Sequence, residues 1–191
     1  MTKPLHSKEG NTELSDAHAK ALVEKYSNVT LVNVDLSNTY ESLLFDIDQD
    51  FVNNKLANAN TKSRLRMVTL YQIAGSVGGI VVGTGNKVED YGVGFYTKYG
   101  DGGVDIAPIA DLYKSEVWEL GEYLDVDQRI VDAKPTDGLW DDGRNDEDQI
   151  GATYVELEEA MENKTGVAVN ILEEYNKKNR HKMEPIPTFK L

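Results

Sequence analysis

The sequence predicts an α/β domain built around a parallel sheet, and three observations support this fold class. Two short runs rich in β-branched residues, 29–34 and 79–83, are typical of buried strands. Segments with apolar residues at helical spacing precede and follow these runs. The chain has 191 residues, which is enough for one domain with a sizeable hydrophobic core. Because strands that alternate with helices favour a parallel sheet, we expect residues 1–191 to form a single such domain.

The first half of the chain alternates between the two kinds of element. Apolar residues at helical spacing predict an amphipathic helix over 13–26, and the strand predicted over 29–34 follows it. The segment 62–74 predicts a long helix. The second predicted strand, 79–83, ends in Thr84-Gly85-Asn86. Ligands commonly bind at such strand-to-loop junctions in α/β folds, so this junction is a candidate site.

The second half of the chain is expected to be helical. Apolar spacing and helix-ending signals predict four helices, over 114–124, 126–133, 153–163 and 167–178. A polar, aspartate-rich stretch separates the first pair from the second pair, and a proline-containing tail closes the chain.

Composition excludes several classes of function. The net charge of −13 disfavours binding to a nucleic-acid backbone, because that affinity comes largely from clustered lysine and arginine. The sequence has no cysteine, which rules out disulfides and thiolate metal sites and suits a reducing compartment. No window approaches the roughly 18 apolar residues of a membrane span. We expect a soluble cytoplasmic protein with neither a nucleic acid nor a membrane as partner.

The segment Lys98-Tyr99-Gly100-Asp101-Gly102-Gly103-Val104-Asp105 is the most informative stretch of the chain. Its three glycines weaken regular structure and contribute no side chain to a core, so we expect them to let main-chain N–H groups approach a ligand. The lysine supplies a charge for phosphate or carboxylate, and the aspartates can orient a cation or a polar nucleophile. A tight surface turn is the competing interpretation of the same pattern.

Six segments occur in order along the chain and together carry a resemblance. They are Ser63-Arg64-Leu65-Arg66-Met67, the run 82–89, the glycine loop 98–105, the run 108–114, Lys134-Pro135-Thr136-Asp137-Gly138-Leu139-Trp140 and Asp146-Glu147-Asp148-Gln149-Ile150-Gly151. In this combination and spacing they resemble ammonia-dependent NAD synthetase over nearly the whole chain. Six ordered motifs are far more specific than a single glycine-rich loop.

The resemblance implies a dimeric ligase of the adenine-nucleotide α-hydrolase, or N-type ATP pyrophosphatase, superfamily with a Rossmann-like sheet. Such enzymes use ATP and Mg²⁺ to adenylate the nicotinate carboxylate of deamido-NAD, and ammonia then displaces AMP to give NAD. A carboxylate is inert to ammonia until one oxygen becomes a good leaving group, and the charge that develops on phosphate calls for magnesium and lysine. The implied partners are deamido-NAD, ATP, ammonia and a second copy of the chain.

The resemblance also implies roles at matching positions for ATP and metal. Thr84, Lys114 and Thr136 match ATP contacts, and Glu89 matches a magnesium ligand, where a carboxylate oxygen suits a hard cation. Lys114 is further implied to be catalytic. The competing interpretations are an ordinary exposed carboxylate for Glu89 and an ordinary first-turn residue of a helix for Lys114. The acidic stretch 137–148 matches a region that orders over substrate, although a flexible loop would look the same.

The implied deamido-NAD contacts come from three parts of the chain. They are Arg64, Lys98, Asp105, His181 and Lys182. Asp105 is also implied to be catalytic, because its matching position lies near the nicotinate carboxylate and could position ammonia. The solvated face of a helix is the alternative for Arg64, and simple exposure near a terminus is the alternative for His181.

One motif of the family pattern does not occur in the sequence. The pattern opens with a strand, a Ser-Gly-Gly-x-Asp-Ser loop and a helix, whereas Pro4-Leu5-His6-Ser7 already matches positions after its second strand. We therefore expect an N-terminally truncated domain without the main-chain cradle for phosphate and without one magnesium ligand. Three readings remain: an NAD synthetase whose amino end is missing from the sequence, a catalytically impaired homologue that keeps only dinucleotide binding or dimerisation, and a related pyrophosphatase with another substrate, which the glycine loop disfavours.

Overall fold

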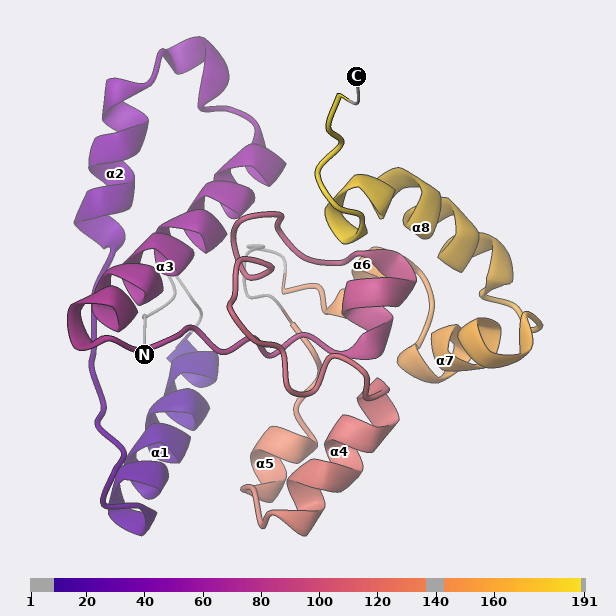
Figure 1. The fold of residues 1–191 in the computed structure, drawn as a ribbon, viewed down its shortest axis with the longest axis horizontal. Helices are drawn as coiled ribbons and strands as arrows, with labels where there is room; N and C mark the ends of the chain where they lie inside the picture. Colours follow the sequence, from indigo (N-terminus) through magenta and orange to yellow (C-terminus); the bar gives the residue numbers. More distant parts are fainter. Residues whose placement is uncertain (1–8, 137–142, 190–191) are drawn as a thin grey trace.

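The computed structural model describes residues 9–136 and 143–189, which are mainly helical (Figure 1). The elements in chain order are α1 (Glu9–Lys25), α2 (Ser37–Asp46), the 3₁₀ helix η1 (Gln49–Phe51), α3 (Lys55–Val77), the π-helix η2 (Val88–Val93), α4 (Lys114–Tyr123), α5 (Gln128–Val131), α6 (Asp146–Ile150), α7 (Tyr154–Asn163) and α8 (Val169–Met183).

Local sequence signals fix the ends of the best-formed helices. The Asn54 side chain accepts a hydrogen bond from the Ala57 N–H and starts α3, and Gly78 ends this helix in the left-handed region with φ 69°. A capping box starts α7, in which Thr153 and Glu156 satisfy each other's backbone N–H groups. These signals satisfy backbone groups that a helix cannot pair internally.

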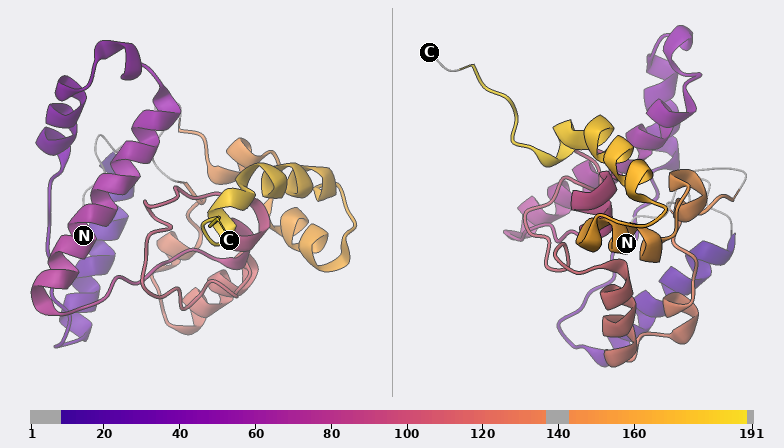
Figure 2. Two further views of the ribbon diagram at one scale, coloured as in Figure 1. Left: turned by 45° about the horizontal axis from the view of Figure 1, so that its top comes forward. Right: turned by 90° about the vertical axis from the view of Figure 1, so that its right-hand side faces the viewer.

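The helices form two groups with an irregular segment between them. Figures 1 and 2 show α1, α2 and α3 on one side of the molecule and α7 and α8 on the other. The segment from Gly79 to Tyr113 lies between the groups and contains η2 as its one helix among the described elements. This segment carries the glycine loop, so both helix groups can contact it.

The larger hydrophobic core lies where η2, α7 and α8 pack together. Its fully buried members include Val88 and Val93 of η2 and Tyr154 and Leu157 of α7. Burial of side chains of this size stabilises the fold by about 1.5–3 kcal/mol each. A smaller cluster around Leu36 and Tyr40 joins α2 to α3. The π-helix is therefore anchored by the core, whereas α1, α2 and α3 are packed more loosely.

The two predicted strands are not strands in the described residues. In the segment 79–83 Val82 forms an isolated parallel bridge with Ile106, in which the Gly83 N–H donates to the Ile106 carbonyl at 2.7 Å and the Val81 carbonyl accepts from the Asp105 N–H at 2.9 Å. In the segment 29–34 Val34 is a bridge residue but no continuous strand forms, and Val32 is 43% exposed instead of buried. A parallel strand needs a hydrogen-bonding neighbour along its length, and for 79–83 the printed parallel pairing in the described residues is confined to Val81, Val82 and Gly83. The bridge between Val82 and Ile106 is parallel, as predicted for the sheet, but the sheet itself is not confirmed.

The predicted helices agree better with the structure. The helices predicted over 13–26, 62–74, 114–124 and 153–163 correspond to α1, α3, α4 and α7, and the one predicted over 126–133 is shortened to α5. The last helix was predicted to end at 178, but α8 continues to Met183, so His181 and Lys182 lie in a helix and not in a tail. Residues 137–142 of the acidic stretch 137–148 lie outside the described residues, and part of the remaining stretch forms α6.

None of the helices in the described ranges combines the length and the hydropathy that crossing a bilayer requires.

Candidate active site

The glycine loop is fastened to α3 by a buried hydrogen-bond network. The Ser63 hydroxyl donates to the Asp101 carboxylate at 2.6 Å and accepts from the Asp101 N–H at 2.9 Å. The same carboxylate oxygen accepts from the Thr97 N–H, and the Thr97 hydroxyl donates to Asn60 at 2.7 Å. Ser63 and Thr97 are both buried. The loop therefore has one fixed position on α3.

Close packing explains two of the loop glycines, which corrects the expectation that they serve only to approach a ligand. A Cβ atom on Gly100 would lie 2.3 Å from the Ser63 hydroxyl oxygen, and one on Gly102 would lie 2.4 Å from the Tyr96 ring. The residue of this loop with a left-handed backbone is Tyr99, at φ 63°. These glycines let the loop lie against α3 and against its own aromatic neighbour.

Glu89 lies in the first turn of the π-helix η2, which sets its direction. The Asn86 side chain is 1% exposed and accepts from the N–H groups of Val88 and Glu89 at 3.0 and 3.1 Å. Gly94 ends the element with φ 63°, a backbone conformation that favours glycine. Single π turns are rare and often mark functional positions. The short sequence between Asn86 and Gly94 thus presents Glu89 from a rigid base.

Within the part of the chain that the structure describes, two side chains donate to the Glu89 carboxylate, and both bind the same oxygen. Oε1 accepts from Lys114 Nζ at 3.1 Å and from the Tyr154 hydroxyl at 2.7 Å. The Glu89 and Lys114 side chains are each 18% exposed. The pKa of Tyr154 is raised, mainly by burial and to a smaller extent by the negative charge of Glu89, so its hydroxyl stays protonated and donates. Lys114 Nζ also lies 4.9 Å from the centroid of the Tyr154 ring.

A polar cavity of about 260 Å³ opens on one side of Glu89. Thr84, Glu89, Asp90, Asp101 and Lys182 contribute its polar side chains. Burial, together with the nearby carboxylates of Glu89 and Asp101, raises the pKa of Asp90 to about 6. The cavity therefore holds several carboxylates and one ammonium group, a lining suited to polar or cationic groups.

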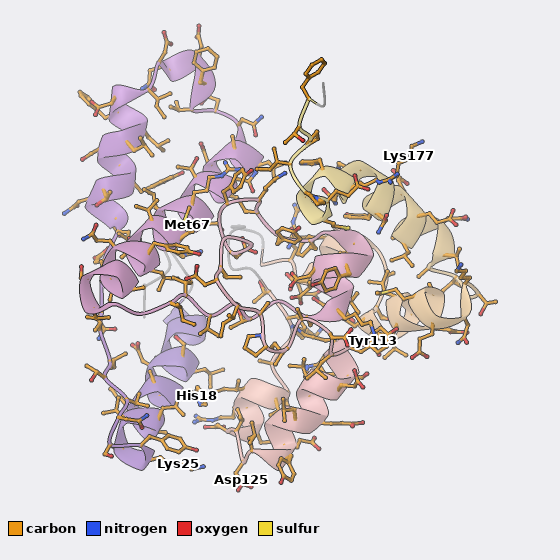
Figure 3. All side chains as sticks on the ribbon, viewed as in Figure 1. His18, Lys25, Met67, Tyr113, Asp125 and Lys177 are labelled. Carbon is orange, nitrogen blue, oxygen red and sulfur yellow. The ribbon has the colours of Figure 1, made fainter. Side chains whose placement is uncertain are left out.

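A larger apolar groove of about 800 Å³ lies between α1 and the pair α4 and α5. Lys114 and Thr136 are among its polar lining residues, and the Trp118 ring forms part of its wall. His18 lies on the side of α1 that faces this groove (Figure 3). Lys114 lines the groove and binds Glu89, which lines the polar cavity. The ion pair of these two residues therefore joins the two spaces.

Three of the predicted dinucleotide contacts form a separate cluster. Arg64 Nε donates to the main-chain carbonyl of Lys98 at 3.3 Å, and Lys98 Nζ donates to the main-chain carbonyl of His181. Neither cavity is lined by these three residues. They connect α3, the glycine loop and the end of α8, and the His181 imidazole does not take part in this connection.

The other two predicted dinucleotide contacts are engaged with main-chain groups. Lys182 Nζ donates to the carbonyls of Gly94 and Tyr96 at 2.8 and 2.7 Å, and burial lowers its pKa. Asp105 accepts from the Val81 N–H at 2.7 Å and from the Tyr71 hydroxyl at 3.1 Å. Asp105 lines neither cavity and instead ties the bridge segments to α3.

The structure thus brings together some of the predicted residues and not others. Glu89, Thr84 and Lys182 share the polar cavity, and Lys114 and Thr136 share the groove. Sequence reasoning missed Tyr154, because this tyrosine is 65 residues from Glu89 and belongs to an ordinary amphipathic helix. It also gave no role to Asp90, although the pair Glu89-Asp90 is an obvious place to look for a second carboxylate.

Replacing Lys182 with Met is expected to weaken the attachment of α8 to residues 94–96, which lead into the glycine loop. The change removes two charge-assisted hydrogen bonds and leaves two carbonyls unpaired, which should lower the free energy of unfolding by about 1.5–3 kcal/mol. Urea denaturation measures this loss. Arg180→Met on the same helix turn is the control, because Arg180 pairs with the exposed Glu184 and should change stability little. Equal stability of the two variants would contradict a stabilising role for the hydrogen bonds from Lys182 to Gly94 and Tyr96.

Comparison with known proteins matches this chain to one family. The family model described as NAD synthase matches residues 4–186. The chain is 36% identical over 171 residues to the NH3-dependent NAD+ synthetase of Carboxydothermus hydrogenoformans, an alignment that covers 87% of this chain and 70% of that protein. It is 42% identical over 149 residues to the protein of the same name from Mycoplasmopsis pulmonis, covering 78% of this chain and 56% of that protein.

Solved structures give the same picture of the fold. The structure of an NMN synthetase from Francisella tularensis superposes with a TM-score of 0.90 at 30% identity, covering 100% of this chain and 77% of that one. The NH3-dependent NAD synthetase of Campylobacter jejuni superposes with a TM-score of 0.72 at 20% identity, which shows the shared fold alone. The chain spans little more than half the length of some curated relatives, such as the Mycoplasmopsis protein at 56%.

Proposed function

Because this chain belongs to the NAD synthase family, we propose that it forms part of an enzyme that amidates deamido-NAD with ammonia at the expense of ATP. The observation that carries the proposal is the Glu89–Lys114 ion pair between the polar cavity and the groove. Both residues belong to motifs of the family resemblance, and the fold brings them together from positions 25 residues apart. A carboxylate and a lysine at one point can serve the phosphates and the cation of a bound nucleotide.

The proposed reaction has two stages with different requirements. In the first, an oxygen of the nicotinate carboxylate attacks the α-phosphorus of ATP, and pyrophosphate leaves. In the second, the nitrogen of ammonia attacks the acyl carbon, and AMP leaves with the electron pair of the broken C–O bond. Lys114, at the start of α4, supplies positive charge where negative charge develops on phosphate, and Thr84 and Thr136 supply hydroxyl groups for phosphate or ribose.

The residues at Glu89 fit a magnesium ion. Both donors bind Oε1, and no described donor is shown on Oε2, which leaves an oxygen for a hard cation. Over the described residues there is no group of three or more His, Asp or Glu side chains that could hold a metal. This agrees with Mg²⁺, which is usually bound by one or two carboxylates together with phosphates and waters. When bound, the ion would neutralise charge on the phosphates.

We assign the deamido-NAD contacts to the surface that joins α3, the glycine loop and the end of α8. Arg64, Lys98 and Lys182 place positive charge there, and His181 is exposed beside them. A dinucleotide carries two phosphates, which this charge can attract. Asp105 keeps its proposed role near the nicotinate and ammonia, although it also supports the backbone of Val81.

We also propose a homodimer and a larger parallel sheet. Apolar side chains that favour self-association are exposed on or near α2 and α3, among them Phe45 at 84%, Phe51 at 72% and Val77 at 77% exposure. The parallel bridge between Val82 and Ile106 is the expected start of a sheet in a single domain. Analytical ultracentrifugation tests the dimer, and a monomer at all concentrations would refute it.

A second product is favoured by one observation. The NMN synthetase of Francisella tularensis superposes over the whole chain with a TM-score of 0.90. The same amidation chemistry applied to the mononucleotide would give NMN in place of NAD. Of the five predicted deamido-NAD contacts, Lys182 alone lines either of the two cavities. The mononucleotide is therefore a candidate substrate of the same site.

An assay of amide formation tests both candidates. The protein that carries this chain is supplied with ATP, Mg²⁺ and ammonia, together with either deamido-NAD or nicotinic acid mononucleotide. We expect NAD or NMN, respectively, together with one AMP and one pyrophosphate for each amide formed. The ratio of the two kcat/KM values identifies the preferred substrate. Formation of ADP and phosphate in place of AMP and pyrophosphate, or no product from either acid, would refute the proposed reaction.

A further inference from the structure

We propose that Tyr154 is a positioning residue that aims the Glu89 carboxylate at the bound cation. This inference rests on the proposed function, because it concerns the metal of the same site. Tyr154 lies outside the six motifs of the resemblance, the last of which ends at Gly151. The residue touches Glu89 through its hydroxyl and Lys114 through its ring.

The distribution of hydrogen bonds on Glu89 is the main evidence. Tyr154 and Lys114 both donate to Oε1, so two donors hold this oxygen. With Oε1 held, rotation of the carboxylate is restricted and Oε2 keeps one orientation. Glu89 lines the polar cavity, where a cation can reach it. Ligands oriented by such second contacts bind metals more tightly, since less freedom is lost on binding.

Tyr154 is itself rigid, which is necessary for this role. Its side chain is fully buried, and the Trp118 ring packs against it edge to face with centroids 6.2 Å apart. Its backbone N–H donates to the Glu147 carboxylate at 2.9 Å, and the capping box of α7 begins one residue before it. The hydroxyl therefore has a fixed position relative to the core of η2, α7 and α8.

The same helix also fixes the turn that carries Lys114. Glu158, one turn after Tyr154 in α7, accepts from the Ser115 N–H at 3.0 Å and from the Ser115 hydroxyl at 2.7 Å. Residues four apart lie on one face of a helix, so Tyr154 and Glu158 act on the start of α4 together. One face of α7 thus sets the relative position of Glu89 and Lys114.

The competing explanation is that Tyr154 has only a structural role. Its buried hydroxyl would then need a hydrogen-bond acceptor, and any acceptor would serve. Tyr175 provides the matched control for this possibility. Its ring packs against the same core, and its hydroxyl donates at 2.9 Å to the main-chain carbonyl of Gln149, with no contact to Glu89. Tyr154→Phe and Tyr175→Phe each remove one hydroxyl group from the same hydrophobic core. They differ in the acceptor that loses its hydrogen bond, which is the Glu89 carboxylate in the first variant and the Gln149 carbonyl in the second.

The test compares the binding of a non-hydrolysable ATP analogue with and without Mn²⁺, by calorimetry on the protein that carries this chain. Tyr154→Phe should reduce the metal-dependent gain in affinity by about 10-fold to 100-fold and leave the metal-free affinity unchanged. Tyr175→Phe should keep the gain of the wild type, although chemical denaturation should show a comparable loss of stability in both variants. The inference would be overturned if Tyr154→Phe kept the metal-dependent gain in affinity of the wild type. It would also be overturned if both variants lost the same share of that gain.

One further readout, which needs no substitution, keeps the test decisive. If Tyr154→Phe does not fold, 3-fluorotyrosine incorporated in the wild type keeps every hydroxyl, and its fluorine resonance at 154 should shift when Mg²⁺ joins the bound analogue. The resonance at 175 should not shift, and a silent position 154 would count against the inference. Failure of the proposed function would give a different result from failure of this inference. The wild type would then bind the analogue neither with nor without the metal ion, and it would form no amide.

Discussion

Replacing Lys114 with Met is expected to lower kcat for amide formation by about 10²–10³, the usual effect of removing one group that stabilises developing charge. Lys114 is the cation that contacts Glu89 and lines the groove at the same time. Met keeps most of the apolar stem of the side chain and removes only its charge and its donors. Steady-state kinetics with saturating ATP and acid substrate measure the effect.

The variant should also be less stable than the wild type. The Glu89 and Lys114 side chains are mostly buried, so the loss of the lysine leaves a carboxylate with the Tyr154 hydroxyl as its one remaining donor. Loss of a hydrogen bond to a charged group costs about 1.5–3 kcal/mol. The kinetic measurement is therefore made at a temperature well below the unfolding transition, which is checked by calorimetry.

Lys87→Met is the matched control for Lys114→Met. Lys87 has the same kinds of partner, with Nζ 3.3 Å from the Asp111 carboxylate and 4.6 Å from the centroid of the Tyr113 ring. Asp111 is 95% exposed, so this pair is screened by water and should contribute little. We expect Lys87→Met to retain kcat within about threefold of the wild type. Equal activity of the two variants would contradict the role given to Lys114.

Replacing Gly100 with Ala is expected to lower the free energy of unfolding by about 1–3 kcal/mol, as overpacking usually does. The added Cβ would lie 2.3 Å from the Ser63 hydroxyl oxygen and 2.9 Å from Thr97 side-chain atoms, and both residues are buried. The loop would have to move away from α3, which would break the hydrogen bonds between Ser63 and Asp101. Urea denaturation measures the loss of stability.

Gly75→Ala is the control within the same pair of elements. Gly75 lies inside α3, and a Cβ there would meet nothing within 4 Å. Alanine is the better helix former, so this variant should be more stable by about 0.4–1 kcal/mol. A loss of stability at Gly75 similar to that at Gly100 would show that the close contact is not the cause. A neutral Gly100→Ala would show that the loop can move freely from α3.

The sequence determined much about this protein by itself. The family resemblance rested on six motifs, and the family model and relatives confirm it. Most helices were also predicted, because apolar spacing and capping residues such as Thr153 act over a few neighbouring positions. The predicted strands were not confirmed, because strand pairing depends on distant segments and Val82 found a partner at Ile106 alone in the described residues.

Only the tertiary structure decided which of the predicted residues meet. It placed Glu89 against Lys114, gave Asp105 and Lys182 main-chain partners, and brought Tyr154 to the Glu89 carboxylate from another helix. It also showed that the Ser63 hydroxyl leaves no room for a Cβ atom at Gly100. Motifs identify residue types within a short stretch, whereas these contacts join positions that are between 24 and 88 residues apart. Such contacts depend on how helices pack, and local sequence patterns do not specify that packing.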